Sequence, residues 1–319
     1  MIAVSAEGLR KVYKGRVEAL KGIDLKVNKG EIFSLLGPNG AGKTTTIGIL
    51  SCVLKPTAGK VQVLGLQVPR QCAKVREIIG VVPQKFMGFS DLTVRENVEY
   101  FVRIYGGKRE QVDEILSSLS LERYSQVRYK RLSGGLIRRV AIACALAGDP
   151  EVLFMDEPSV GLDPKSRREL WKIVKDVKGE GRTVLMTTHY MEEADQLCHR
   201  IAIINRGKIV AVGTPAELKA KAGGTVVVFE LSQGFDGENL KGVKGVLESQ
   251  LKDGTLSVTL DDESHVVDLL RAIDLKKVKS VKILKPSLDT AFLKLTGSTI
   301  EEAEVDYRKF YAMIRRATR

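Results

Sequence analysis

A glycine-rich run, GPNGAGKTT, lies between an apolar segment and a stretch that can form a helix. The preceding segment, Glu31–Leu36, has the apolar composition of a buried strand, and Thr44–Leu54 can continue as a helix. The run fits the pattern G-x-x-x-x-G-K-[ST], which requires a strand before it and a helix after it. The chain is therefore expected to fold around a phosphate-binding loop at the end of a sheet strand.

Each part of this loop has an expected role in binding a nucleoside triphosphate. Gly37, Gly40 and Gly42 let the backbone curl so that successive N–H groups point at phosphate oxygens. The helix that follows adds the positive end of its dipole. Lys43 is expected to neutralise the β and γ phosphates, and the Thr44 hydroxyl to ligate Mg²⁺. The other loop positions expected to line the nucleotide are Pro38, Asn39, Ala41 and Thr45.

Two further motifs follow along the chain. Ser133, Gly134 and Gly135 open a segment of helical periodicity, and a hydroxyl with exposed N–H groups at a helix start is a second anion site; an ordinary loop is the alternative. Asp156 and Glu157 end the apolar strand VLFM, where carboxylates are costly unless a cation or hydrogen bonds compensate them. Adjacent strand residues point to opposite sides, so we expect Asp156 to hold the water shell of Mg²⁺ and Glu157 to polarise the attacking water.

Three more residues are candidates because of their positions. His189 ends the strand TVLMTT, at the carboxyl edge where open α/β sheets place ligands; a structural histidine is the alternative. Gln84 ends another strand and could reach the metal or the water, or could simply lie on the surface. Tyr13 could stack on adenine or only pack within its strand.

The composition limits the classes of protein to which the chain can belong. Its 319 residues, 44% hydrophobic and 28% charged, can bury a sizeable core and exceed one typical domain. The net charge of +12 favours any polyanion, so it does not choose between nucleic acid, an anionic membrane and nucleotide phosphates. The sequence contains no run of about 18 apolar residues and no signal-peptide pattern, so neither a membrane span nor secretion is expected.

The four cysteines form no C-x-x-C pair and no metal-like cluster with the three histidines. They are expected to be small buried or reactive thiols in a reducing compartment. We therefore expect a cytoplasmic protein without structural zinc.

Apolar periodicity predicts an α/β fold with two domains. The first stretch alternates in period two, as short antiparallel strands do, and apolar residues at spacings of three and four predict a helical block within about residues 88–150. Beyond it, wholly apolar strands alternate with helices, which indicates a largely parallel sheet covered on both faces. The composition loosens at Lys219–Gly224, so we place the boundary between residues 1–220 and residues 221–319.

The second domain is expected to be small and α+β. Its predicted strands are TVVVFEL, TLSVTL and VKSVKIL, with a helix around His265–Ile273. A last amphipathic helix, Ile300–Ala317, is expected to serve in packing or dimerisation more than as a membrane anchor, because its apolar stripe has few large aliphatic residues.

The ordered motifs over residues 1–220 resemble the ATP-binding cassette family, the nucleotide-hydrolysing subunits of ABC transporters. LSGG at Leu132–Gly135 is similar to the family signature, and VLFMDE to the Walker B segment with its catalytic glutamate. In family terms, the other matches are Tyr13 with the adenine-stacking aromatic, Gly37–Thr45 with the Walker A loop, Gln84 with the Q-loop, Asp163 with the D-loop and His189 with the switch histidine.

The resemblance implies a P-loop cassette with a mostly parallel sheet, an antiparallel β subdomain and a helical subdomain. It implies a head-to-tail homodimer in which the signature of one subunit covers the ATP and Mg²⁺ held by the other. It also implies a separate transmembrane permease, facing the helical block and Gln84, and a place on the inner face of the cell membrane. Leu136 departs from the usual glutamine, so an amide contact is lost while the backbone cradle remains.

The direction of transport is indicated by PSLDTAFLKLTG at Pro286–Gly297, which resembles the closing motif of drug, lipid and polysaccharide exporters. The alternatives are a non-transport cassette acting on nucleic acid or ribosomes and a regulator that binds nucleotide without turnover. Cassettes of DNA repair contain coiled coils or zinc modules, and those of translation carry two cassettes in one chain. The sequence has neither feature, so no nucleic-acid partner is expected.

Overall fold

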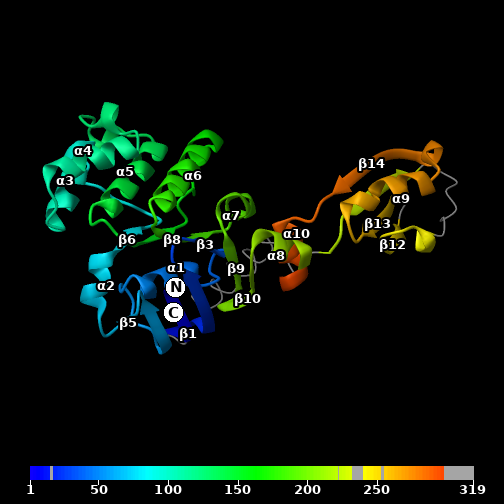
Figure 1. The fold of residues 1–319 in the computed structure, drawn as a ribbon, viewed down its shortest axis with the longest axis horizontal. Helices are drawn as coiled ribbons and strands as arrows, with labels where there is room; N and C mark the ends of the chain where they lie inside the picture. Colours follow the sequence, from blue (N-terminus) through cyan, green and yellow to red (C-terminus); the bar gives the residue numbers. More distant parts are fainter. Residues whose placement is uncertain (15–16, 222, 232–239, 253–254, 298–319) are drawn as a thin grey trace, which may run out of the picture. The chain divides into compact units, whose positions relative to one another are not determined.

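The computed structural model describes residues 1–297 apart from residues 15–16, 222, 232–239 and 253–254. These residues form two compact units, the first Met1–Thr214 and the second beginning at Pro215 (Figure 1). The predicted helix at Ile300–Ala317 lies outside the described residues. The predicted domain boundary at Lys219–Gly224 falls at the end of a helix, α8, that belongs to the second unit.

A six-stranded sheet lies at the centre of the first unit. Its strand order is β10-β9-β3-β8-β7-β6, and all neighbours are parallel except β9 and β10. The strands are β3 Ile32–Leu36, β6 Ile79–Val82, β7 Val152–Asp156, β8 Thr183–Thr188, β9 Arg200–Asn205 and β10 Lys208–Gly213. β3, β7 and β8 are buried along their whole length, which is why none of them shows the strict alternation of apolar and polar residues found in a strand with one exposed face. The predicted parallel sheet is confirmed.

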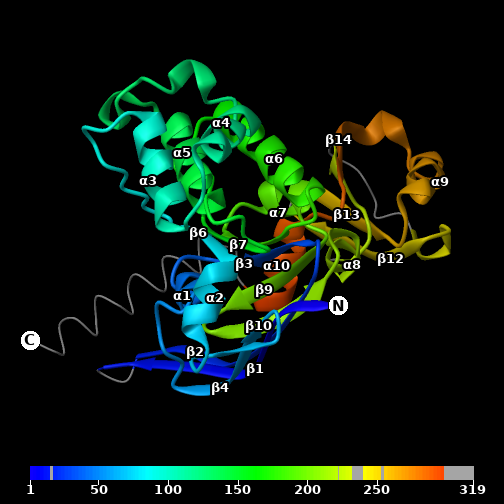
Figure 2. The same ribbon diagram turned by 60° about the vertical axis from the view of Figure 1, so that its left-hand side comes forward.

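Helices cover both faces of this sheet (Figure 2). Helix α1 lies on one face, and α6 and α7 lie on the other. The bounds are α1 Lys43–Leu50, α2 Cys72–Ile78, α6 Pro164–Gly179 and α7 Met191–Leu197. The predicted helix that starts at Thr44 and the predicted alternation of strands with helices are therefore confirmed, whereas α2 was not predicted.

An antiparallel sheet packs on the other side of α1. Its order is β2-β1-β4-β5, and its strands are β1 Ile2–Tyr13, β2 Val17–Asn28, β4 Ala58–Val63 and β5 Leu66–Val68. The antiparallel prediction is confirmed, but β1 and β2 have 12 residues each and are longer than expected. Shifts in their pairing register, one of them between Ala6 and Leu9, interrupt the alternation of apolar residues without ending the strands.

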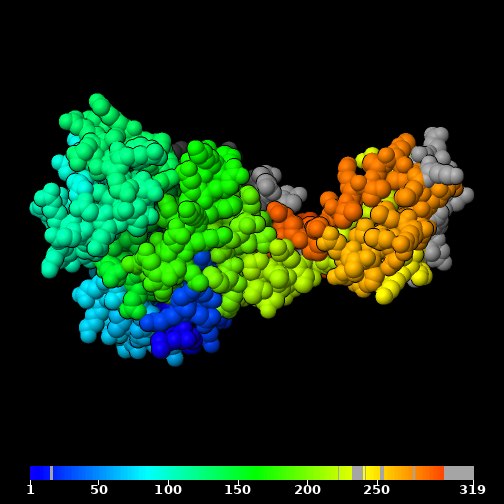
Figure 3. Space-filling model, turned by 45° about the horizontal axis from the view of Figure 1, so that its top comes forward, coloured from blue at the N-terminus to red at the C-terminus, as the bar shows by residue number. Residues whose placement is uncertain are grey.

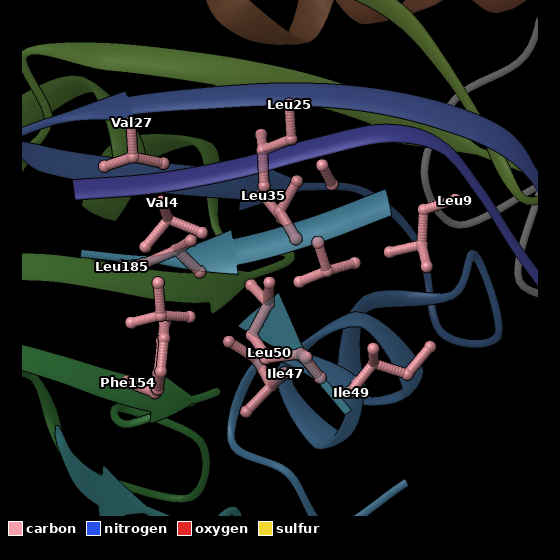
Figure 4. Packing of buried hydrophobic residues seen from close by; sticks show 14 of the residues in the cluster. Val4, Leu9, Leu25, Val27, Leu35, Ile47, Ile49, Leu50, Phe154 and Leu185 are labelled. Carbon is pink, nitrogen blue, oxygen red and sulfur yellow. The ribbon is translucent and has the colours of Figure 1, made fainter. Parts of the chain in front are cut away.

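The core of the first unit joins both sheets through α1 (Figure 4). Ile47, Ile49 and Leu50 of α1 are buried together with Phe154 of β7 and Leu185 of β8. The residues that the antiparallel sheet contributes include Val4, Leu9, Leu25 and Val27. The helix that follows the phosphate loop is thus packed on two sides, which fixes the loop in space.

The predicted helical block is confirmed between β6 and β7. Its helices are α3 Val94–Ile104, α4 Arg109–Ser118 and α5 Gly134–Leu146. Thr93 caps α3 in a reciprocal arrangement with Glu96, whose carboxylate accepts from the Thr93 backbone. In the space-filling view, the cyan-green atoms of this block lie together at the upper left, away from the dark blue atoms of β1 (Figure 3).

The second unit contains a four-stranded antiparallel sheet of order β12-β13-β11-β14. Its elements are α8 Pro215–Lys221, β11 Val226–Leu231, β12 Val246–Lys252, β13 Thr255–Leu260, α9 Val266–Ala272, β14 Val278–Leu284 and α10 Leu288–Thr296. Phe229, Val258 and Leu269 are buried in the core between this sheet and α9. The three predicted strands and the helix α9 are confirmed; β12 and α8, which are rich in polar residues, were not predicted.

The cysteine prediction is wrong for two of the four residues. Cys52 and Cys72 form a disulfide, with Cα atoms 5.6 Å apart, because α2 begins beside the end of α1. Cys144 and Cys198 are free and buried, as expected. Among the described residues, no helix combines the length and apolar character needed to cross a bilayer.

The contact of α1 with both sheets generates a stability prediction. Leu50→Ala removes a fully buried side chain from the core and should lower the free energy of unfolding by about 2–5 kcal/mol, as measured by chemical denaturation. Val53→Ala, three residues later on the surface, is the control and should change it by less than about 0.5 kcal/mol, because Val53 is 75% exposed. Equal losses in the two variants would contradict this account of the core.

Candidate nucleotide site

The phosphate loop is tied to the end of the neighbouring strand. The Gly37 N–H donates to the Thr188 carbonyl of β8 at 3.1 Å. A Cβ atom at Gly37 would lie 2.1 Å from the Ile204 carbonyl oxygen, so no other residue fits there without moving a strand. Gly42, with φ of 109°, takes a left-handed conformation that favours glycine. The predicted glycine requirement therefore has a structural cause at these two positions.

The N-terminus of α1 is suited to phosphate. Gly42 is its N-cap, and among the residues that the structure describes no side chain caps this end. The first N–H groups of a helix need partners from outside it, and an anion supplies them. The Thr46 hydroxyl donates to the Gly42 carbonyl at 2.9 Å, whereas Thr44 is exposed at the start of the helix. Thr44 thus has the hydroxyl that a metal ion could reach.

The Lys43 ammonium is buried and held by three oxygens. Its Nζ lies 2.7 Å from the Gly37 carbonyl oxygen and 3.0 Å from that of Pro38. It also lies 2.9 Å from Glu157 Oε1. A buried charge is stable only when it is paired and hydrogen-bonded, and these contacts meet that requirement. The predicted phosphate-binding lysine and the predicted catalytic glutamate are therefore in direct contact.

Glu157 lies at the centre of the site. Its backbone N–H donates to Thr187 Oγ1 at 2.9 Å, and its Oε2 accepts from Gln84 Nε2 at 3.0 Å. His189 Nδ1 is 3.5 Å from Oε1. Burial alone would raise the pKa of Glu157, but the His189 ring and the Lys43 ammonium outweigh it and lower this pKa to about 2. The carboxylate is therefore ionised at neutral pH, the state that a general base requires.

Asp156 is buried beside Glu157 and has a different partner. Its Oδ1 accepts from Thr187 Oγ1 at 2.6 Å, so the same hydroxyl that accepts from the Glu157 N–H donates to Asp156. Thr187 thus orients both acidic residues, and it was not predicted. The signal available in the sequence was its place at the end of TVLMTT, next to His189.

Oxygen atoms suited to Mg²⁺ are present in the predicted ligands. Hard cations bind hydroxyl, carboxylate and amide oxygens, which Thr44, Asp156 and Gln84 supply. Because Gln84 donates its amide nitrogen to Glu157, its amide oxygen is left for a cation or a water. These residues and the uncapped helix end together fit a nucleotide with its metal ion.

Tyr13 lies at the edge of this site. Its hydroxyl is 3.2 Å from Thr45 Oγ1, which places the ring beside the phosphate loop. The ring is partly exposed, and Lys11 Nζ lies 5.2 Å from its centre. An open aromatic face beside the loop can stack on a base.

The signature residues and Asp163 lie outside the cluster around Lys43. Ser133 caps α5, its hydroxyl accepting from the Leu136 N–H at 3.4 Å, while Gly134 and Gly135 form the first turn. Asp163 caps α6, and the hydrogen bonds from Ser166 lower the pKa of its carboxyl. A Cβ at Gly135 would lie 2.8 Å from Ser166 Oγ, so the two helix starts approach closely. The chain therefore has a second helix start with accessible glycines.

Two family profiles match the chain. The ABC transporter family matches residues 20–160, and a family described as ATP-binding protein DrrA1-3-like, C-terminal domain, matches residues 213–296. The second match covers most of the second unit.

Several characterised relatives match over nearly their whole length. The daunorubicin resistance ATP-binding protein DrrA3 of Streptomyces coeruleorubidus is 39% identical over 92% of this chain and 96% of its own. The linearmycin resistance ATP-binding protein LnrL of Bacillus subtilis is 34% identical over 94% of this chain and 100% of its own. The Nod factor export ATP-binding protein I of Rhizobium etli is 36% identical over 95% and 96%, respectively.

Solved structures resemble the first unit. CbiO1 of Clostridium perfringens, part of the ABC transporter complex cbiONQ, superposes with a TM-score of 0.64 and 30% identity over 69% of this chain and 91% of that one. The ATP-binding cassette MJ0796, in a dimeric post-hydrolysis state bound to ADP and phosphate, gives 0.61 and 32% over 66% and 98%.

The residues matched by the two family profiles include the phosphate loop, the acidic end of β7 and most of the second unit. The relatives favour the transport ATPase over the nucleic-acid alternative that the net charge leaves open. The chain belongs to the ABC transporter family and is one of its ATP-hydrolysing subunits, of the export type.

Proposed function

We propose that two copies of this chain close head to tail on two ATP molecules and drive a separate transmembrane permease that exports small molecules. The contact that carries the proposal is the one between Lys43 and Glu157, 2.9 Å apart in a buried position. It places a phosphate-binding cation beside an ionised base, at the carboxyl edge of the sheet where the phosphate loop begins. The first unit would be the ATP-binding cassette and the second an accessory domain.

In this proposal the residues divide the work of hydrolysis. Lys43 and the N–H groups at the start of α1 hold the phosphates, and Thr44, Gln84 and Asp156 hold Mg²⁺. The metal ion, when bound, neutralises charge that develops on the phosphate oxygens. Glu157 orients and polarises the attacking water, and His189, 3.5 Å from Glu157, steadies the γ-phosphate. Tyr13 stacks on the base.

Glu157→Gln tests the role of the base. It should lower kcat for ATP hydrolysis by about 10²–10⁴ while ATP is still bound, because the amide fills the same space but cannot accept a proton. Steady-state phosphate release and equilibrium ATP binding measure the two properties. Glu151→Gln, an exposed position immediately before β7, is the matched control and should retain the wild-type rate. A Glu157→Gln variant with wild-type turnover would rule the assignment out.

The second helix start supports a dimer in which the sites are shared. Ser133, Gly134 and Gly135 lie outside the cluster around Lys43, at the start of a helix suited to bind an anion. Phosphate-binding surfaces that do not meet within one chain can meet across two copies. The related cassette MJ0796 is dimeric with ADP and phosphate bound.

The dimer prediction uses a variant that cannot hydrolyse ATP. Glu157→Gln should become dimeric when ATP is added, as measured by light scattering. Adding Ser133→Glu should prevent this, because a carboxylate would face the phosphates held by the partner, while ATP binding to each copy remains. Ser117→Glu, an exposed serine of α4, is the control for the added charge. Persistence of the dimer in the Ser133→Glu variant would exclude the proposed arrangement.

The permease would bind the exposed apolar side chains of the segment that follows Gln84 and of α3 with the residue after it. The exposed apolar residues of this patch are Met87, Phe89, Tyr100, Ile104 and Tyr105. Met87 is 89% exposed, and the rings of Phe89 and Tyr100 lie 4.7 Å apart in an edge arrangement. Exposed apolar patches of this kind mark protein interfaces. We infer that the chain lies on the inner face of the membrane through this contact.

The relatives indicate the chemistry of the cargo. Three of them are named for resistance to daunorubicin, for resistance to linearmycin and for export of Nod factor. We therefore infer that the cargo is a molecule of the same kind as daunorubicin, linearmycin or Nod factor, recognised by the permease.

Tyr100→Glu tests the docking patch. It should leave basal ATPase activity within about twofold of wild type, because the Tyr100 ring is exposed and packs on Phe89 and Phe101, and a surface change costs little stability. Daunorubicin efflux, measured in cells that express this chain together with its permease, should fall by about tenfold through burial of a charge in an apolar contact. Gln126→Glu, on the same helical block, should leave efflux unchanged. Unchanged efflux in Tyr100→Glu would move the interface elsewhere.

A further inference from the structure

A buried acidic residue of α7 has no role in the site described above. Glu193 is 0% exposed, which is unusual for a carboxyl group. Its Oε1 accepts from Trp171 Nε1 of α6 at 3.1 Å. Burial raises the pKa of Glu193, and the neighbouring side chains of Thr188, Ser159 and Trp171 oppose this effect. A carboxyl group in such a position costs free energy unless hydrogen bonds compensate its burial.

The second oxygen of this carboxyl is unsatisfied. Among the described residues, neither Glu193 Oε2 nor the buried Ser159 Oγ has a hydrogen bond of good geometry, although the two side chains are neighbours. Glu193 Oε2 can only accept when the carboxyl is ionised, and the Ser159 hydroxyl can donate. An acceptor and a donor left unpaired side by side are suited to pair after a small movement.

The neighbours of Glu193 belong to two segments that carry reacting groups. Ser159 lies two residues after Glu157, in the segment that joins β7 to α6. Thr188 directly precedes His189 at the end of β8. The Thr188 hydroxyl also accepts from the Tyr190 N–H at 2.9 Å, which tightens the turn that holds His189. The Glu193 carboxyl therefore lies where the positions of Glu157 and His189 can be set together.

We propose that Glu193 is a positioning residue for ATP hydrolysis, whose carboxyl accepts from Ser159 Oγ in the hydrolysing state and so fixes the segment after Glu157 against the turn that carries His189. This inference rests on the proposed roles of Glu157 and His189. It differs from a purely structural role, in which Glu193 would serve only to accept from Trp171.

The kinetic test uses two variants that remove the same hydrogen bond from opposite sides. Glu193→Gln keeps the shape and an acceptor for Trp171 but replaces the other acceptor with an amide donor, and Ser159→Ala removes the hydroxyl. Each should lower kcat by about tenfold, the value of a hydrogen bond to a charged group, while KM for ATP stays within about threefold. The kcat of the double variant should be no lower than that of the less active single variant, because both changes remove the same contact.

Two further measurements separate this role from a structural one. Glu192→Gln, the adjacent exposed position, is the control and should keep kcat within about twofold of wild type. Trp171 is the single tryptophan of the chain, so its emission reports on this cluster. In the Glu157→Gln background, ATP with Mg²⁺ should shift that emission, and adding Ser159→Ala should abolish the shift without loss of bound ATP.

The outcomes distinguish the two proposals. Wild-type turnover in Glu157→Gln or His189→Ala would defeat the proposed function itself. If those variants behave as expected, a Glu193→Gln kcat within twofold of wild type, or losses that multiply in the double variant, would overturn the positioning role alone. Should Glu193→Gln fail to fold, the Ser159→Ala kinetics and the tryptophan emission decide the matter, and an unaltered shift in Ser159→Ala would overturn the proposal.

Discussion

The buried ion pair between Lys43 and Glu157 is the interaction on which the rest of the site depends. Two charges removed from water are costly unless each finds a partner and the remaining hydrogen-bonding positions are filled. Here the carbonyls of Gly37 and Pro38 accept hydrogen bonds from the ammonium, and the Gln84 amide donates one to the carboxylate. The three motifs that supply these groups are therefore obliged to lie together. In the proposed function, a bound triphosphate would offer the lysine other oxygens and would free the carboxylate to orient water.

The two-sided packing of α1 gives this pair a fixed frame. Ile47, Ile49 and Leu50 are buried between the six-stranded sheet and the antiparallel sheet, so the loop that precedes them starts from a rigid helix end. Close-packed interiors resist displacement, which keeps the N–H groups of the loop aimed before any ligand arrives. A site built in this way gains its affinity from geometry that folding has already arranged. The antiparallel sheet thus supports the phosphate loop from below while contributing Tyr13 at its edge.

Much of the fold and site could be predicted because their signals are local. The phosphate loop, the acidic strand end and the periodicities of β7, β8 and α3 lie within short windows of sequence. Thr187 and Glu193 could not be found in this way, since their importance comes from contacts with residues about 30 positions away. The disulfide between Cys52 and Cys72 likewise follows from the approach of two helices. Elements that were missed, such as α2 and β12, mix polar with apolar residues, which leaves no clear period.

The backbone of Glu157 has a φ of 46°, in the left-handed region that residues other than glycine and asparagine rarely adopt. Strain of this kind persists only where surrounding structure enforces it, and it turns the carboxylate back toward the lysine. Chemistry and conformational ease are therefore opposed at this one position. Glycine at this position would relieve the backbone strain but would remove the carboxylate. In relatives that no longer hydrolyse ATP, we therefore expect substitution of the residue that follows β7 before substitutions accumulate among the buried residues.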